Sequence, residues 1–437
     1  MTRLARREMR RYLAAMEEAD YLFRHAAVRD AAYHLQLPSE RARLHKHTLE
    51  ILEGLLPAPD LNQYATALAD HAQLAQVGVT WLGDALPRKE LAYLQSAAQA
   101  AVARYENQLA AALFDRLATH PAASAGQRID AMIEGGVILW FAGRRQAAIL
   151  RLDEAVTRAA DDRRRLAFAL IERGTLYRDL NQTDRAEHDL TAALQAAQQC
   201  SDESLQLRAL GNLCTVRQAG KNGAEVEALY APVLELARRL NNSRAVGISL
   251  GQIAQGWLDL GDYRKAESLL LQSLDLLRGA GDLMNMAVML STLGSAFLRR
   301  HDGDVRGARQ RAVSYFREAI RVNLDIGNRP QQAEAKAGLA RACLELGLEL
   351  EAETTALAAV SDGRELGKSA AVASGLDILG LIWAGRGNTH QAEVDWRESL
   401  ALSAPGSSAA RQTRAQLVTL LRKAGRHRDA ELVETTA

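Results

Sequence analysis

The chain has 437 residues, a formal net charge of +1, 48% hydrophobic residues and 24% charged residues. This balance is typical of a folded protein, and it excludes a disordered chain and a global electrostatic attraction to nucleic acid or anionic lipid. The three cysteines lack metal-type spacing, and no apolar run reaches the roughly 18–20 residues that a membrane span needs. We therefore expect a cytoplasmic protein with reduced thiols, no bound cofactor and no metal site.

The first distinct segment, residues 21–45, reads YLFRHAAVRDAAYHLQLPSERARLH. It resembles the segment that closes the winged-helix region in large bacterial signalling ATPases, which regulate transcription or accompany adenylate cyclase domains. The matching positions are Phe23, Arg24, His25, Arg29, Asp30, Tyr33, Leu37, Pro38, Arg41 and His45. Only twenty residues precede this segment, so the resemblance implies the sensory half of such a protein and does not imply ATP hydrolysis. Whether the chain is a natural full-length protein or a fragment stays open.

Two interpretations of this segment follow from its residues. In the first, Tyr33 and Leu37 pack against other helices, while the arginines and histidines cap helices and meet solvent. In the second, the segment is a docking surface for a partner ATPase. The text that follows it, at 84–117, also resembles the entry repeats of the signalling ATPases.

From about residue 90 onward the chain repeats itself. Each unit has a leading position, which is usually glycine. These positions lie 38, 38, 39, 41, 46, 40, 40 and 38 residues apart, at Tyr105, Gly143, Asn181, Gly220, Gly261, Gly307, Gly347, Gly387 and Gly425. Five residues later an alanine recurs in every unit except the one at Gly220, where Ala224 comes one residue early. A glutamate often follows that alanine, as in Glu353 and Glu393, where it suits the positive end of a helix dipole.

Each unit predicts two helices separated by a break at the recurring residue. In one unit we expect the first helix over Ser243–Leu260 and the second over Tyr263–Leu277, with Gly261-Asp262 between them. Leu379-Gly380 with Trp383, followed by Ala392 and Trp396, resembles the signature of the tetratricopeptide repeat. The resemblance covers about residues 90–437 and implies a long-helix variety of that family.

The expected fold is all-α: a right-handed superhelical solenoid of about eight or nine helix pairs, preceded by a helical segment. We expect a segment at 1–60 that resembles the end of a winged-helix region. Entry helices and a degenerate first repeat follow at 61–125, and the superhelix at 126–437. The stretch RRHDGDVRG adds about six residues between two helices, which predicts a tolerated loop insertion or a loop that contacts a partner.

Two motifs imitate catalytic or nucleotide-binding sites. Gly247 to Gly251 fits the G-x-S-x-G nucleophile elbow, but Ser249 lies inside a predicted helix with no strand before it. The stretch GRELGKS at 363–369 looks like a phosphate-binding loop, but three residues separate its glycines where four are required. Gly367 lies twenty residues past Gly347, as Gly281 does past Gly261. We therefore expect a turn between repeats there and no nucleotide binding.

A solenoid of helix pairs exposes a groove lined by the first helix of each pair. The tetratricopeptide resemblance implies that this groove includes Trp140, Arg178, Gln255, Asp259, Ser295, Arg299, Arg341 and Asp377. We expect a non-enzymatic interaction module in bacterial signalling that binds a protein or peptide, with an ATPase or regulator as one class of partner. The alternative is a sensor of a small effector that changes the conformation of the superhelix. Self-association stays open, and neither a membrane nor nucleic acid is an expected partner.

Overall fold

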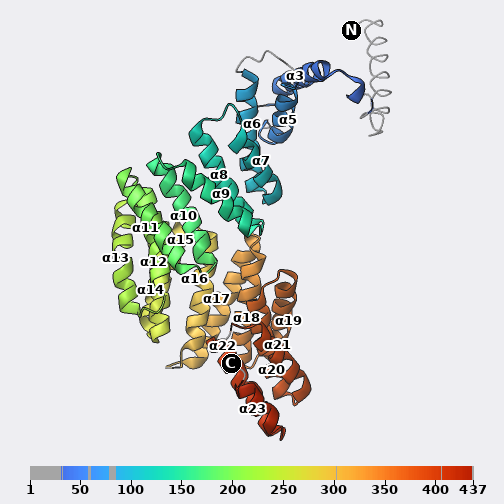
Figure 1. The fold of residues 1–437 in the computed structure, drawn as a ribbon. Helices are drawn as coiled ribbons and strands as arrows, with labels where there is room; N and C mark the ends of the chain where they lie inside the picture. Colours follow the sequence, from blue (N-terminus) through green and yellow to red (C-terminus); the bar gives the residue numbers. More distant parts are fainter. Residues whose placement is uncertain are drawn as a thin grey trace, which may run out of the picture. The chain divides into compact units, whose positions relative to one another are not determined.

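The computed structural model describes residues 31, 33–57, 61–77, 85–301, 303–404 and 406–435. The chain divides into two compact units, Met1–Leu213 and Cys214–Ala437. Every regular element in the described residues is a helix, and helices adjacent in sequence pack against each other within each unit (Figure 1). The prediction of an all-α fold of stacked helix pairs is confirmed.

The first unit begins with helices that precede the regular repeats and continues with helix pairs. Its helices are α3 (Pro38–Leu55), α5 (Ala65–Leu74), α6 (Ala85–Ala103), α7 (Asn107–Thr119), α8 (Ala125–Phe141), α9 (Arg145–Arg158), α10 (Arg163–Asp179) and α11 (Thr183–Gln199). Helix α12 (Glu203–Arg217) follows and crosses the boundary between the units.

The second unit contains the most regular repeats. Its helices are α13 (Gly223–Arg239), α14 (Ser243–Leu260), α15 (Tyr263–Gly279), α16 (Leu283–Arg299), α17 (Val305–Asp325), α18 (Arg329–Glu345), α19 (Glu349–Glu365), α20 (Ser369–Gly385), α21 (Thr389–Leu402), α22 (Ser408–Lys423) and α23 (His427–Thr435). The even-numbered helices α14 to α22 also contact one another in series, so they share one face of the unit.

The recurring residue of the sequence marks the turns between helices. Gly261, Gly347 and Gly387 have φ angles of +87°, +79° and +77°, in the left-handed region that glycine enters without steric cost. The turns that lead into the next pair also contain a left-handed glycine, since Gly281 and Gly367 have φ angles of +69° and +65°. Left-handed glycines therefore mark the ends of helices within each pair and between pairs.

The recurring alanine is a fully buried position in the second helix of the pair. Ala266, Ala312, Ala352 and Ala392 have no exposed surface, so a larger side chain there would overpack the core. The unit at Gly220 departs from this column. Ala224 is exposed, and Val226 at 2% exposure takes the buried position instead, because α13 begins at Gly223 and shifts the register.

The recurring glutamate has a partner that its position in the first turn did not reveal. Arg386 Nη2 lies 2.6 Å from Glu353 Oε2, and Arg426 pairs with Glu393 in the same way. In both pairs the arginine follows the first helix of the next repeat. The glutamate column therefore joins successive repeats in addition to lying near a helix N-terminus.

The insertion lengthens a helix more than it lengthens a loop. The turn residue is Gly303, with a φ of +68°, and not Gly307, which lies in the first turn of the 21-residue helix α17. The Asp304 side chain caps that helix by accepting a hydrogen bond from the Gly307 amide at 2.8 Å. Residues 300–304 separate α16 from α17, so the expected loop insertion is present, but this cap starts the helix early and places the rest of the inserted length in α17.

Buried Arg309 holds the insertion against its neighbours. Its Nη1 donates to the carbonyls of Phe297 and Arg300 at 2.7 and 2.8 Å, and its Nε lies 2.6 Å from Glu345 Oε2. The guanidinium thus caps the C-terminal end of α16 and ties it to the end of α18.

The segment with the winged-helix resemblance is described only from residue 31, so Phe23 to Asp30 lie outside the described residues. Leu37 is 63% exposed, so the expectation that it packs is wrong. Tyr33 is half-buried, and His45 turns toward α5 and not into solvent. No helix in the described part of the chain is long and apolar enough to cross a membrane.

Both imitated motifs are structural. Ser249 is buried in α14, and its hydroxyl donates to the Ala245 carbonyl at 2.8 Å, which is an intrahelical bond. In GRELGKS, Gly363 lies in α19, Gly367 makes the left-handed turn and Ser369 begins α20. Within the described residues no strand precedes either motif, so the local structure of a nucleophile elbow or a phosphate loop is missing there.

Candidate functional site

The shared face of α14, α16, α18, α20 and α22 contains the main hollow of the second unit. The hollow has a volume of about 830 Å³. Serine, threonine and glutamine side chains line much of it, including Ser291, Ser295, Gln331 and Gln412. A lining of hydroxyls and amides offers both hydrogen-bond donors and acceptors to a ligand.

A second hollow of about 540 Å³ adjoins the first at the start of the unit. It lies between the end of α12 and α14, and its lining includes Gln218, Gln252 and Asp259. Gln255 lines both hollows, so they meet at this side chain, and their lining residues together run from Thr215 to Thr413. We call this surface the groove.

The structure places six of the eight predicted site residues along the groove. Gln255, Ser295, Arg299, Arg341 and Asp377 line the main hollow, and Asp259 lines the second. The Gln255 amide donates to Asp259 Oδ1 at 2.9 Å, so these two side chains orient each other.

The other two predicted residues, Trp140 and Arg178, belong to the first unit. Arg145 stacks over the Trp140 ring, with its guanidinium carbon 5.6 Å from the ring centre. Arg178 donates to Asn212 Oδ1 at 2.9 Å and pairs with Asp179. Neither residue lies in the groove of the second unit.

Asp377 and Arg341 form a pair that belongs to the wall of the groove. Asp377 is 7% exposed, accepts a hydrogen bond from Thr413 at 2.7 Å and is ion-paired with Arg341. The Asp377 backbone carbonyl accepts the indole N–H of Trp396 at 3.1 Å. Because its charge is already compensated, Arg341 is a weaker candidate for an anionic ligand than its position suggests.

Arg299 differs from Arg341 in this respect. It lies exposed at the end of α16 and has no ion-pair partner within the described part of the chain. His301, at the start of the insertion, lines the same hollow. Arg299 is therefore the groove arginine whose charge is available to a ligand.

Several lining residues escaped the prediction because it took one or two positions from each helix. On α18, Gln331, Glu334, Ala335 and Gly338 line the hollow together with Arg341, at spacings of three and four residues. A helical face has this spacing, so extending the face from Arg341 could have found them. In α22, Gln412 and Thr413 lie in a repeat whose signature is weak in the sequence.

The described residues contain no group of three histidine, cysteine, aspartate or glutamate side chains arranged to hold a metal ion. No protein-family model matches the sequence, and no curated protein matches it.

Solved structures with similar folds are found. A signal transduction ATPase with numerous domains from Pyrococcus horikoshii, which carries a tetratricopeptide repeat sensor, matches 94% of this chain with 15% identity and a TM-score of 0.51. The match covers 57% of that protein, so this chain corresponds to little more than half of its length. The chain has a tetratricopeptide-type fold. Human IFIT1, in a dimer with m7Gppp-AAAA, matches 91% of this chain and 91% of its own, with 13% identity and a TM-score of 0.53.

Proposed function

We propose that this tetratricopeptide-type chain is a non-enzymatic interaction module of a signalling system, which binds an extended segment of another protein in the groove. The observation that carries this proposal is that the two hollows meet at Gln255 along one face of successive helices. A cavity for a small molecule typically has about 300–1,000 Å³, whereas the two hollows together exceed that range and follow successive helices.

The chemistry of the lining supports a polypeptide ligand. An extended peptide presents alternating backbone N–H and C=O groups that must be hydrogen-bonded when they leave water. The amides of Gln331 and Gln412 and the hydroxyls of Ser291 and Ser295 supply both kinds of partner. Arg299 adds a positive charge, which favours a carboxylate on the ligand.

The same lining does not favour a polyanion such as RNA. Binding of nucleic acid depends on several cations that neutralise phosphates. Arg341 is already paired, and Glu334 adds negative charge to the hollow. We therefore do not expect this chain to bind a capped RNA such as the one in the human structure.

A second candidate is a small effector that binds in the main hollow and changes the conformation of the repeats. The volume of that hollow alone, about 830 Å³, lies within the usual range for small ligands and favours this candidate. We further propose a cytoplasmic, bacterial setting and a partner ATPase or regulator. The winged-helix resemblance of residues 21–45 supports both.

Photo-cross-linking tests the proposal directly. A benzophenone side chain at Ser295, inside the groove, should capture a defined polypeptide that the same group at Leu350, exposed on α19, does not capture. A synthetic peptide of the captured segment then gives an affinity by fluorescence anisotropy. A dialysable small molecule that shifts the melting temperature, with no polypeptide captured at Ser295, would favour the effector and contradict the proposal.

A charge reversal adds a matched comparison. Arg299→Glu should weaken peptide binding by about tenfold or more, the effect expected for a lost charged hydrogen bond. Arg321→Glu makes the same change at an exposed position of α17 outside the groove and should leave the affinity unchanged. Equal losses in both variants would show that net charge, and not the groove, governs binding.

A further inference from the structure

Two histidines meet between the first helices of the chain. His45 on α3 and His71 on α5 are both half-buried, and their Nδ1 atoms lie 2.8 Å apart. The ring centres are 5.0 Å apart, so the two nitrogens lie almost on the line that joins the centres. This is the geometry of a head-on hydrogen bond. A shared metal ion would require both lone pairs to point to one side of that line.

The hydrogen bond fixes where the protons are. One Nδ1 must carry a hydrogen and the other must present a lone pair. Tyr33 Oη lies 3.0 Å from His45 Nε2 on the far side of the ring. All three groups are satisfied if Tyr33 donates to His45 Nε2 and His45 Nδ1 donates to His71 Nδ1. We call His45 and His71 the histidine pair.

While this contact is intact, the histidine pair can hold one extra proton but not two. Two added protons would place two N–H groups and two positive charges face to face at 2.8 Å. The Arg41 guanidinium, stacked on Tyr33, adds a third positive charge nearby. Burial, followed by His71 and then Arg41, lowers the pKa of His45 below its usual value of 6.5.

No carboxylate in the described residues faces the pair to offset these charges. From α6, Lys89 and Tyr93 both bind Glu53, two turns further along α3. From α7, Arg116 binds Asp70, the neighbour of His71. The acidic groups close to these helices are therefore already engaged with other partners.

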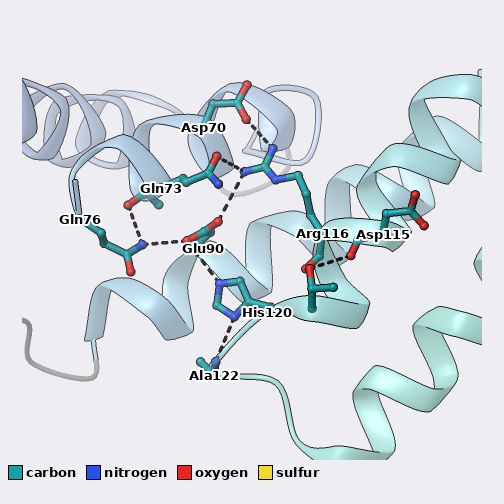
Figure 2. Close-up of polar contacts among 10 residues, drawn as sticks. Asp70, Gln73, Gln76, Glu90, Asp115, Arg116, His120 and Ala122 are labelled. Atoms are coloured by element: carbon teal, nitrogen blue, oxygen red, sulfur yellow. Dashed lines mark hydrogen bonds and ion pairs between the residues drawn. The ribbon is translucent and has the colours of Figure 1, made fainter. Parts of the chain in front are cut away.

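The opposite side of α5 is held by a different kind of network (Figure 2). Arg116 donates to Asp70 at 2.6 Å and to Gln73 at 2.9 Å. Behind it, buried Glu90 accepts a hydrogen bond from the Gln76 amide at 2.7 Å.

The network ends at His120, which is buried between Glu90 and the start of the next repeat. His120 Nε2 lies 3.3 Å from Glu90, and His120 Nδ1 accepts the Ala122 amide at 3.2 Å. In this network positive groups face negative or neutral ones, so it lacks the like-charge conflict of the histidine pair.

We infer that the contact between α3 and α5 is a proton-sensitive latch, closed while the histidine pair carries at most one extra proton and opened when both imidazoles are protonated. Helix α5 stays bound to α6 and α7 through the network of Figure 2. The sign follows from linkage. Because His45 binds protons less readily in the closed contact than in the open one, the contact loses stability as the pH falls below about 6.5.

Hydrogen–deuterium exchange of the full chain tests the inference, compared at about pH 7.5 and about pH 5.5 with intrinsic exchange rates corrected. Amides of α3 should lose protection by up to about tenfold per pH unit for each proton taken up on opening. Amides of α7 and α8 should keep theirs. His71→Asn retains a polar group near the Nδ1 position but does not titrate, so it should reduce the pH dependence to the part that burial and Arg41 impose on His45 alone.

His47→Asn is the matched control, since His47 lies on the same helix with a side chain 58% exposed and pairs with Glu50. It should behave as the wild type does. Protection of α3 that is equal at both pH values, or a pH dependence in His71→Asn as steep as in the wild type, would overturn the inference.

If His71→Asn fails to dock α3 at either pH, imidazole ¹⁵N spectra of the wild type at neutral pH decide the question. One protonated and one bare Nδ1 within the pair support the latch. Two rings that carry their hydrogens only on Nε2 overturn it.

Discussion

Replacing Gly380 by alanine should destabilise the repeat formed by α20 and α21, although alanine is the better helix former. A Cβ at Gly380 would lie 2.4 Å from Nε1 of Trp396, far inside van der Waals contact. Trp396 is 3% exposed, and its Nε1 donates to the Asp377 carbonyl on the same helix. The indole must therefore move, and its hydrogen bond to Asp377 is lost.

The change in stability is the sum of one favourable and two unfavourable contributions. Helix propensity favours alanine over glycine by about 1 kcal/mol. Overpacking a well-filled site costs about 1–3 kcal/mol, and a lost buried hydrogen bond costs about 1 kcal/mol. We expect a net loss of about 2 kcal/mol, which corresponds to roughly thirtyfold faster exchange of the protected amides in α20 and α21.

Gly385 provides the matched control, because it lies in the same helix and an added Cβ would meet nothing within 4 Å. Gly385→Ala should leave exchange in α20 unchanged or slow it slightly. In a Trp396→Ala background, Gly380→Ala should no longer accelerate exchange, since the clashing ring is gone. The packing argument fails if Gly380→Ala exchanges as slowly as the wild type, or if both alanine variants behave alike.

Three further results are expected. Gly367→Val should lower the free energy of unfolding in urea by about 1–2 kcal/mol, because φ is +65° there. Lys368→Ala should leave that free energy nearly unchanged, and neither the wild type nor this variant should bind a nucleotide. Burial raises the pKa of the Cys343 thiol to about 11, so this thiol stays protonated at about pH 8. A thiol reagent should then label the partly exposed Cys200 well before Cys343 in the native chain, and comparable rates would contradict the burial. Arg309→Met should speed amide exchange at the C-terminal end of α16, since two carbonyls lose their donor there; unchanged exchange would mean that water replaces it.

The sequence predicted the features that local chemistry controls. Glycine at a left-handed turn and alanine at a closely packed helix position leave periodic signals, so a helix pair over 243–260 and 263–277 could be predicted from residues alone; in the structure the second helix extends to Gly279. An error arose where a glycine fitted the repeat but did not form the turn. Gly307 followed the period but belongs to a helix that Asp304 starts early.

The sequence predicted which helices line the groove, but not which of its charged side chains are already ion-paired. Arg299 and Arg341 look equivalent in the sequence, because each lies near the end of the first helix of a pair. Only the fold shows that Arg341 is neutralised by Asp377, 36 residues further along the chain, whereas Arg299 is not. The contact of His45 with His71 was missed for the same reason, since residues 26 apart leave no periodic trace.

The left-handed turns make the second unit modular. Gly347 and Gly387 are 40 residues apart and have φ angles within a few degrees of each other. Removing one helix pair between two such turns, or inserting another, would join backbones that already share a conformation. The Arg386–Glu353 pair would leave as part of the excised piece, while the Arg426–Glu393 pair would remain. The groove can therefore be lengthened or shortened in whole helix pairs, so gene duplication or deletion could fit it to ligands of different lengths.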